Sequence, residues 1–130
     1  MNLTLQNGEQ FQVKGVHGQN IFYQGINRDC LIFLFDARRD INEIVKNFTA
    51  ENCKKIVIED GENKYLHENY TIRIALGLGY QAEALGNAVT KDGTQCVFVK
   101  MAQSTLSERQ LQQQQETLDA LLVATLEGNE

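Results

Sequence analysis

Histidine is the side chain best suited to acid–base chemistry and metal binding near neutral pH, and this chain has two, His17 and His67. They are far apart in the sequence, and neither has a cysteine or carboxylate at the spacing typical of metal ligands. Neither has a nucleophile or orienting partner at a recognised spacing, although folding can bring distant groups together. We therefore predict no metal site, no catalytic residue and no enzymatic activity.

A second motif with chemical meaning is G-x-G-x-x-A, which begins at Gly77 and ends at Ala82. It follows a predicted strand, the context in which such a motif binds the pyrophosphate of a dinucleotide. The segment after it supplies no acidic residue at the end of a second strand, where a ribose would need one. We expect no cofactor, and we attribute Gly77 and Gly79 to close packing on one face of the strand.

Charged side chains flank an apolar stretch in the first half of the chain, and we name them the Asp29–Asp40 rim: Asp29, Asp36, Arg38, Arg39 and Asp40. We interpret the rim as ion pairs and a helix cap. The alternative is a ligand-binding edge. This alternative makes the protein a cytoplasmic module that binds a small molecule or peptide, through the rim or a free sheet edge.

The composition is that of a soluble folded protein with one core: 130 residues, of which 42% are hydrophobic and 22% charged. The net charge of -5 and the scattered basic residues argue against nucleic-acid binding. No segment resembles a signal peptide or a membrane span, so we expect a cytoplasmic protein without membrane contacts. The three cysteines lie in or beside apolar runs, which predicts buried reduced thiols at Cys30, Cys53 and Cys96.

The elements that would position these residues begin with a hairpin. Leu3, Leu5, Phe11 and Val13 must share one face, because side chains alternate along a strand. A three-residue turn at 7–9 would pair Leu5 with Phe11 and Leu3 with Val13, and we predict this register, with a bulge.

Two strands should follow. We expect a turn around His17–Gly18, a strand at 20–25 and a polar turn at 25–29. Residues 30–35, C-L-I-F-L-F, are apolar on both faces, which indicates a central strand that is covered on both sides.

Asp40 opens the clearest helix of the first half, with Glu43 placed to complete a capping box and apolar residues at helical spacing: Ile41, Ile44, Val45 and Phe48. The helix should end near 49–52. We expect a strand at 55–59, a turn at Asp60–Gly61 and a short strand at 64–67.

In Tyr70–Tyr80 every even position carries a large apolar side chain, and every odd position except Arg73 carries a small one. We predict one long strand around which the fold is organised. Its heavy face, which carries the large side chains, should be buried, and its light face, which carries the small ones, should be open to a helix or second subunit. Residues 81–94 are predicted to be an exposed, mobile connection. The last strand should be 95–101, antiparallel to the long one.

A helix of about 22 residues follows, from a capping box of Thr105 and Glu108 to Gly128. Its first half is mostly polar and its end is apolar. A weak heptad seam runs through Leu111, Leu118, Leu121 and Thr125, interrupted by Gln114. The apolar end should bind other copies or dock on its own domain, and the candidate interaction residues are Leu111, Leu118, Leu121, Leu122 and Leu126.

These elements predict an α+β fold: a mainly antiparallel twisted sheet with one short packed helix and a long C-terminal helix. We expect residues 1–101 to form a mainly β domain with its helix near 40–49, and 105–127 to form a helix for association or docking.

The order of motifs resembles small proteins encoded among the tail and baseplate genes of phages and prophages of Gram-positive bacteria. The matching segments span nearly the whole chain: Leu3–Gly8, Asn27–Phe35, Phe48–Cys53, Tyr70–Arg73, Val97–Leu111 and Glu116–Leu122. The resemblance implies a non-enzymatic role in the tail or its assembly, with other copies and other tail proteins as partners. It implies a location in the bacterial cytoplasm during assembly, and in the virion tail if the protein belongs to the finished particle.

Overall fold

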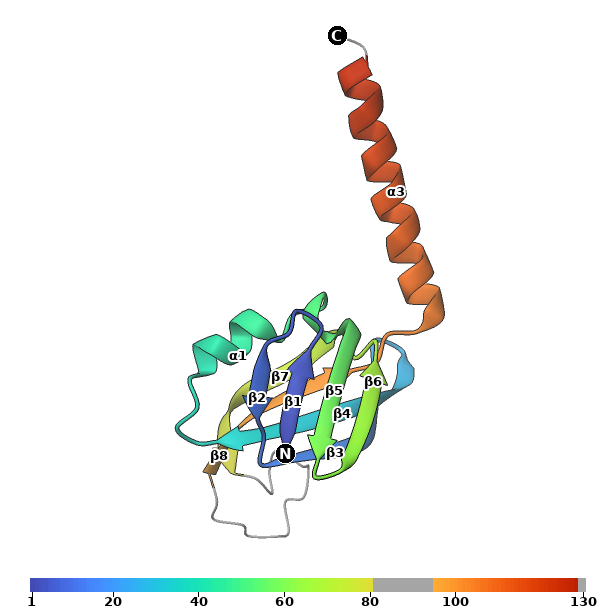
Figure 1. Cartoon of the computed structure of the whole chain (residues 1–130). Helices are drawn as coiled ribbons and strands as arrows, with labels where there is room; N and C mark the ends of the chain where they lie inside the picture. The colour runs from blue at the N-terminus through green and yellow to red at the C-terminus, as the bar shows by residue number, and fades with distance from the viewer. Residues whose placement is uncertain (81–94, 129–130) are drawn as a thin grey trace.

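The computed structural model describes residues 1–80 and 95–128, with side chains of the last helix described through residue 122. Its strands form two antiparallel sheets packed face to face, and the strands of one cross those of the other (Figure 1). One sheet has the order β2-β1-β5-β6, with bounds Gln10–Gln12, Asn2–Leu5, Lys55–Asp60 and Asn63–Glu68. The other has the order β3-β4-β8-β7, with bounds Gly15–Tyr23, Ile26–Asp36, Gln95–Ala102 and Ile72–Tyr80.

The predicted α+β class is confirmed, with the strands divided between two sheets. Helix α1 (Ile41–Asn47) packs against the sheets, a short 3₁₀ turn η1 (Asn52–Lys54) precedes β5, and helix α3 (Leu106–Gly128) ends the described chain. The division of the chain into a domain at 1–101 and a helix at 105–127 stays a prediction.

Aromatic side chains form the centre of the core between the sheets. The Phe48 ring centroid lies 5.4 Å from that of Phe11, 5.6 Å from Phe33 and 5.7 Å from Phe35. All four residues are at most 2% exposed. Each buried ring contributes about 2 to 3 kcal/mol through the apolar surface that it removes from water.

Helix α1 closes one side of this core. Asp40 caps it by accepting a hydrogen bond from the Asn42 backbone N–H at 2.9 Å. Ile44 is fully buried, while Val45 is 42% exposed, so the predicted apolar face is narrower than its spacing indicates. Glu43 does not complete a capping box, because it pairs with Arg39 at 3.3 Å. The helix ends at Asn47, earlier than the predicted 49–52.

The central strand predicted at 30–35 is confirmed as part of β4, which lies between β3 and β8. Phe33 and Phe35 face the core between the sheets, while Ile32 and Leu34 belong to a second buried cluster on the other face. The prediction of buried cysteines is also confirmed at Cys30, Cys53 and Cys96. Burial raises the pKa of the Cys53 thiol to about 12.

The first hairpin has the predicted shared face but a different register. Leu3 pairs with Phe11, and the Leu5 N–H bonds the Glu9 carbonyl at 3.0 Å. The turn therefore occupies residues 6–8, one residue earlier than predicted. Gly8 explains the shift, because its φ of +88° at the last turn position is one that glycine adopts without strain.

The turns predicted at His17–Gly18 and 25–29 are both wrong. Strand β3 runs without interruption through Gly18 and pairs with β4 from Gly15 to Tyr23. The chain reverses at Gln24 and Gly25, where φ is 51° and 84°. Two successive positive φ values define the two-residue turn whose twist matches that of antiparallel strands. The strand at 55–59, the turn at Asp60–Gly61 and the strand at 64–67 correspond to β5, the β5–β6 turn and β6.

The stretch predicted to organise the fold is an edge strand, β7, and its large side chains do not share one face. A bulge between Arg73 and Ala75 shifts the register. Ile74 consequently packs with the outer cluster, Leu76 packs with the main core, and Leu78 is 53% exposed. A bulge reverses which face later residues occupy, and sequence alternation alone does not reveal it.

The light face of β7 is occupied in part by an aromatic ring. A Cβ placed on Gly77 or Gly79 would lie 3.7 or 3.5 Å from the Phe98 ring of the neighbouring strand. The predicted antiparallel pairing of β7 with the last strand, β8, is confirmed. The predicted connection at 81–94 and Ala82 of the glycine motif lie outside the described residues.

Candidate interaction site

Helix α3 leaves the sheets at one end and projects away from them (Figure 1). The predicted capping box is confirmed at its start. The Thr105 N–H donates to Glu108 Oε1 at 2.8 Å, and the Glu108 N–H donates to Thr105 Oγ1 at 3.1 Å. Two of the N–H groups that a helix start leaves without partners are thus satisfied, which fixes where α3 begins.

The base of α3 is anchored to the sheets by Arg28 of β4, which is 4% exposed. Its Nη1 and Nη2 donate to the two carboxylate oxygens of Glu108 at 2.5 and 2.8 Å. Nε donates to the Tyr23 carbonyl at 3.0 Å, and Nη1 also donates to the Gln103 carbonyl at 3.2 Å. A buried guanidinium with this many acceptors holds the first helical turn in one position.

The ion pair changes the acidity of the carboxylate. The hydrogen bonds from Arg28, followed by the backbone N–H of Thr105, lower the pKa of Glu108 to about 2. Burial opposes this shift in the pKa of Glu108 but is outweighed by the hydrogen bonds. The Glu108 side chain is 39% exposed, whereas that of Arg28 is 2% exposed. Glu108 is therefore charged at neutral pH, and it serves Arg28 and the helix cap together.

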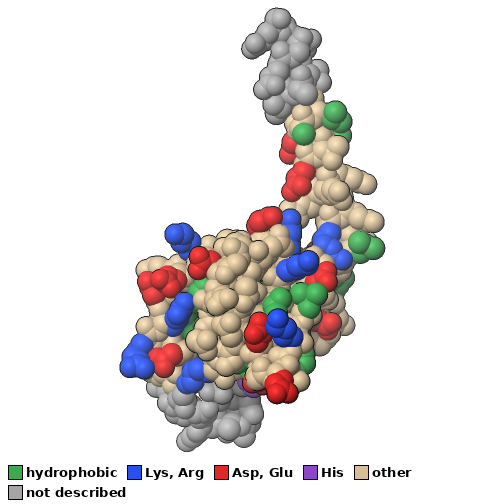
Figure 2. Space-filling view, viewed as in Figure 1, with side chains coloured by type: hydrophobic (Ala, Val, Ile, Leu, Met, Phe, Trp, Pro, Cys, Tyr) green, Lys and Arg blue, Asp and Glu red, His purple; other side chains and the backbone are tan. Residues whose placement is uncertain are grey.

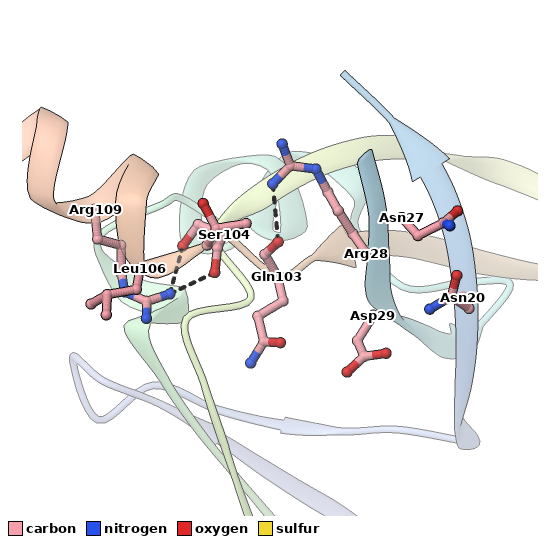
Figure 3. Close-up of a pocket in the computed structure, with 9 residues that line it drawn as sticks. Asn20, Asn27, Arg28, Asp29, Gln103, Ser104, Leu106 and Arg109 are labelled. Carbon is pink, nitrogen blue, oxygen red and sulfur yellow. Dashed lines mark hydrogen bonds between the residues drawn. The ribbon is translucent and has the colours of Figure 1, made fainter. Parts of the chain in front are cut away.

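The linker before α3 is bonded to the strands beneath it. The Gln103 N–H donates to the Asp29 carbonyl at 2.8 Å, and the Ser104 N–H donates to the Asn69 carbonyl at 2.9 Å. Arg109 reaches back to donate to the Ser104 carbonyl at 2.5 Å (Figure 3). The linker therefore holds the base of the helix as a fixed structure.

Four of the five candidate interaction residues of α3 are described, and all four are exposed. Leu111, Leu118, Leu121 and Leu122 are 68, 60, 59 and 60% exposed, and the side chain of Leu126 lies outside the described residues. Docking onto the chain's own domain, one of the two predicted uses of this helix, therefore does not bury these four leucines. Association through them stays a prediction.

The exposed leucines form a stripe along one side of α3. At 100° per residue, Leu111, Leu118 and Leu122 lie within about 40° of one another, and Leu121 lies about 60° from Leu118. Leu106 is also 62% exposed, but it lies roughly 140° around the helix from Leu111. We name Leu111, Leu118, Leu121 and Leu122 the leucine stripe.

The Asp29–Asp40 rim does not form one site. Asp29 is the fourth residue of the eleven-residue strand β4 and Asp36 is its last, so they lie roughly 23 Å apart at 3.3 Å per residue. At the C-terminal end of β4, Arg38 Nε donates to the Asp36 carboxylate at 3.1 Å, and Asp40 caps the following helix α1. Ion pairs and a cap are thus confirmed for Asp36–Asp40, whereas Asp29 belongs with the base of α3.

A polar cavity of about 320 Å³ lies between the β3–β4 hairpin and the start of α3 (Figure 3). Asn20, Asn27 and Asp29 line it from the hairpin, and Leu106 and Arg109 line it from the helix. The hairpin residues are exposed, so the cavity is open to solvent. Amide and carboxylate groups here could hydrogen-bond a polar ligand.

A second, more apolar cavity of about 280 Å³ opens between the two sheets on the side of edge strands β3 and β6. Val16, Leu31 and Ile58 form its walls, with Tyr65 and His67 beside them. Burial lowers the pKa of His67, whose ring lies edge-on to Tyr70 with centroids 5.8 Å apart. Among residues 1–80 and 95–128 no three metal-binding side chains come together.

The surface of the sheets carries both signs of charge side by side, and hydrophobic side chains appear along the projecting helix (Figure 2). Within the described part of the chain, neither α1 nor α3 is long and apolar enough to cross a membrane.

Sequence reasoning identified the leucine stripe but missed Arg28. The apolar spacing of α3 was a sufficient signal for the leucines. Arg28 carries no comparable signal, because its partner Glu108 is 80 positions away and the pair depends on the fold. Comparison of the chain with protein-family models, curated proteins and solved structures gives no match.

Proposed function

We propose that this protein is a non-enzymatic assembly protein that binds other copies of itself and neighbouring proteins through α3. The observation that carries this proposal is a long helix fixed at its base by a buried ion pair, with the leucine stripe exposed along it. Exposed apolar stripes on helices mark protein-binding surfaces. The two-sheet domain serves as the rigid body that the helix connects.

The proposed setting is a phage or prophage tail, and it rests on the resemblance of motif order described above. In that setting the chain acts as a structural protein of the tail or of its assembly, in the bacterial cytoplasm and then in the virion tail if it remains there. An antiparallel domain with a projecting helix suits such a role, because the contact surface is separate from the folded core.

The test is the mass in solution of the full chain, measured by light scattering, beside two matched variants. Leu118→Gln changes the leucine stripe, and Leu106→Gln changes an equally exposed leucine on another side of α3. We expect the full chain and the Leu106→Gln variant to have a multiple of the 14.7 kDa monomer mass, and Leu118→Gln to shift toward the monomer. A monomeric full chain at tens of micromolar would contradict self-association.

Substitution is a cleaner test than truncation. A chain ending at Met101 would lose Glu108 and leave the buried Arg28 without its carboxylate partner. Loss of association in that chain could then result either from removal of the helix or from damage to the domain, because an uncompensated buried charge is strongly destabilising.

The polar cavity at the base of α3 favours the second candidate function, a small-molecule or peptide binding module. Its lining includes Asp29, one end of the predicted rim. Native mass spectrometry of the freshly purified full chain tests this function. A retained ligand that is lost in an Asn27→Ala variant would support it, and a protein of bare sequence mass would not.

A further inference from the structure

We infer that α3 pairs with α3 of a second copy in parallel and in register, so that the sheet domains gather at one end of a helical bundle. This inference rests on the self-association proposed above, and it adds the direction and alignment of the helices. The occupant of the leucine stripe is thus the same stripe of another copy.

The distribution of apolar side chains along α3 selects the parallel direction. Four glutamines follow Leu111, and three of the four stripe leucines, Leu118, Leu121 and Leu122, stand together beyond them. Parallel helices in register place leucine against leucine at positions 111, 118 and 121. Fully overlapped antiparallel helices would place Leu118–Leu122 of one copy against the glutamines of the other, which leaves apolar side chains facing polar ones.

The charges on α3 permit this contact between identical surfaces. With Leu111 and Leu118 at core position a of a heptad, Gln114 and Leu121 occupy core position d. From Gln110 to Leu122 the flanking e and g positions then hold only uncharged residues, namely Gln110, Gln115, Thr117 and Leu122. Glu116 and Asp119 fall at the outer f and b positions, so like charges of two copies do not meet across the seam.

Gln114 gives the bundle a means of fixing its register. A polar side chain at one core position lowers stability but specifies alignment, because its amide can bond the same amide of the partner only when the helices are in register. Gln114 is exposed in the single chain and lies between Leu111 and Leu118 on the same side of the helix. The residue that weakens the heptad seam thus supplies its specificity.

The base of α3 leaves room for several domains at one end. Leu118 lies twelve residues after Leu106, so it stands roughly 18 Å along the axis from the first helical residue. The Arg28–Glu108 ion pair and the Thr105 cap fix the helix only at its first turn. The main apolar contact is therefore formed well beyond the base of the helix.

Disulfide formation in the full chain tests the alignment. Gln114→Cys places a thiol in the proposed seam, and Gln113→Cys places a thiol in the same turn but about 100° around the helix, at outer position c. The native cysteines are buried, so the unsubstituted chain serves as a background control. Under mild oxidation we expect at least tenfold more covalent dimer from Gln114→Cys than from either control, and light scattering should give all three reduced proteins the same mass.

The outcomes separate this inference from the proposed function. An oligomer in which Gln114→Cys cross-links no faster than Gln113→Cys would overturn the parallel, in-register alignment and leave the assembly role standing. A full chain that is monomeric by light scattering would overturn both. Preferential cross-linking of Gln114→Cys within an oligomer supports both, because parallel helices in register place residue 114 of two copies side by side, whereas fully overlapped antiparallel helices place it opposite residue 120. Antiparallel helices that cross at residue 114 would also bring the two thiols together, but they would place Leu118 against Gln110 and leave the leucine stripe without an apolar partner.

Discussion

The two α-helices in the described part of the chain, α1 and α3, use their apolar side chains in opposite ways. Helix α1 has seven residues, buries Ile44 completely and is followed by the fully buried Phe48. Helix α3 has 23 residues and exposes the leucine stripe to solvent. A seven-residue helix has little stability of its own and depends on packing, whereas a long capped helix can persist with few contacts. Here the short helix completes the core, and the long one carries the surface that we propose binds a partner.

The strongest challenge to this comparison is Phe48→Ala. Removing a ring that packs against Phe11, Phe33 and Phe35 should lower the free energy of unfolding by about 3 to 5 kcal/mol, since it leaves a cavity at the centre of the core. Urea unfolding measures the change. Val45→Ala, at a 42% exposed position of α1, is the control and should cost less than about 1 kcal/mol. Equal losses of unfolding free energy in Phe48→Ala and Val45→Ala would show that the cluster of aromatic rings does not dominate the packing of the core next to α1.

Removing either partner of the Arg28–Glu108 ion pair, which anchors α3, should lower stability by a different amount. Glu108→Ala leaves the buried Arg28 charge uncompensated and also removes the capping box, so we expect a loss of about 3 kcal/mol. Arg28→Met leaves a carboxylate that is 39% exposed and can be hydrated, so we expect a loss of about 1 kcal/mol. Urea unfolding of both variants decides the order. A larger loss from Arg28→Met would mean that the hydrogen bonds of Arg28 to backbone carbonyls matter more than its charge.

Acid should release the same anchor with a smaller effect. Folding lowers the pKa of Glu108 from its ordinary value of 4.5 to about 2, so this group contributes stability above pH 4.5. The contribution is lost as the pH falls from 4.5 through about 2, because protons then bind the unfolded chain first. The difference in unfolding free energy between the full chain and Glu108→Gln, followed by urea titration at several pH values, should shrink over this window. A constant difference would exclude Glu108 as the source.

The sequence predicts best where structure depends on neighbouring residues. The capping box of Thr105 and Glu108, the Asp40 cap and the apolar run of β4 all involve local signals, and all three are present. The bulge in β7 is different, because it depends on how β8 pairs with it. The leucine stripe was predicted from spacing, but its anchor was not, since an Arg28–Glu108 pair exists only when two distant segments meet.

The long sequence separation of the Arg28–Glu108 pair also orders events during folding. Contacts within α3 are local and form in about a microsecond, whereas closing an 80-residue separation awaits the β3–β4 hairpin and β8. The helix can therefore exist before its direction is set. Chains in which the second sheet is incomplete carry the same leucines on an untethered helix. The ion pair would therefore make the geometry of the proposed assembly depend on completion of the fold.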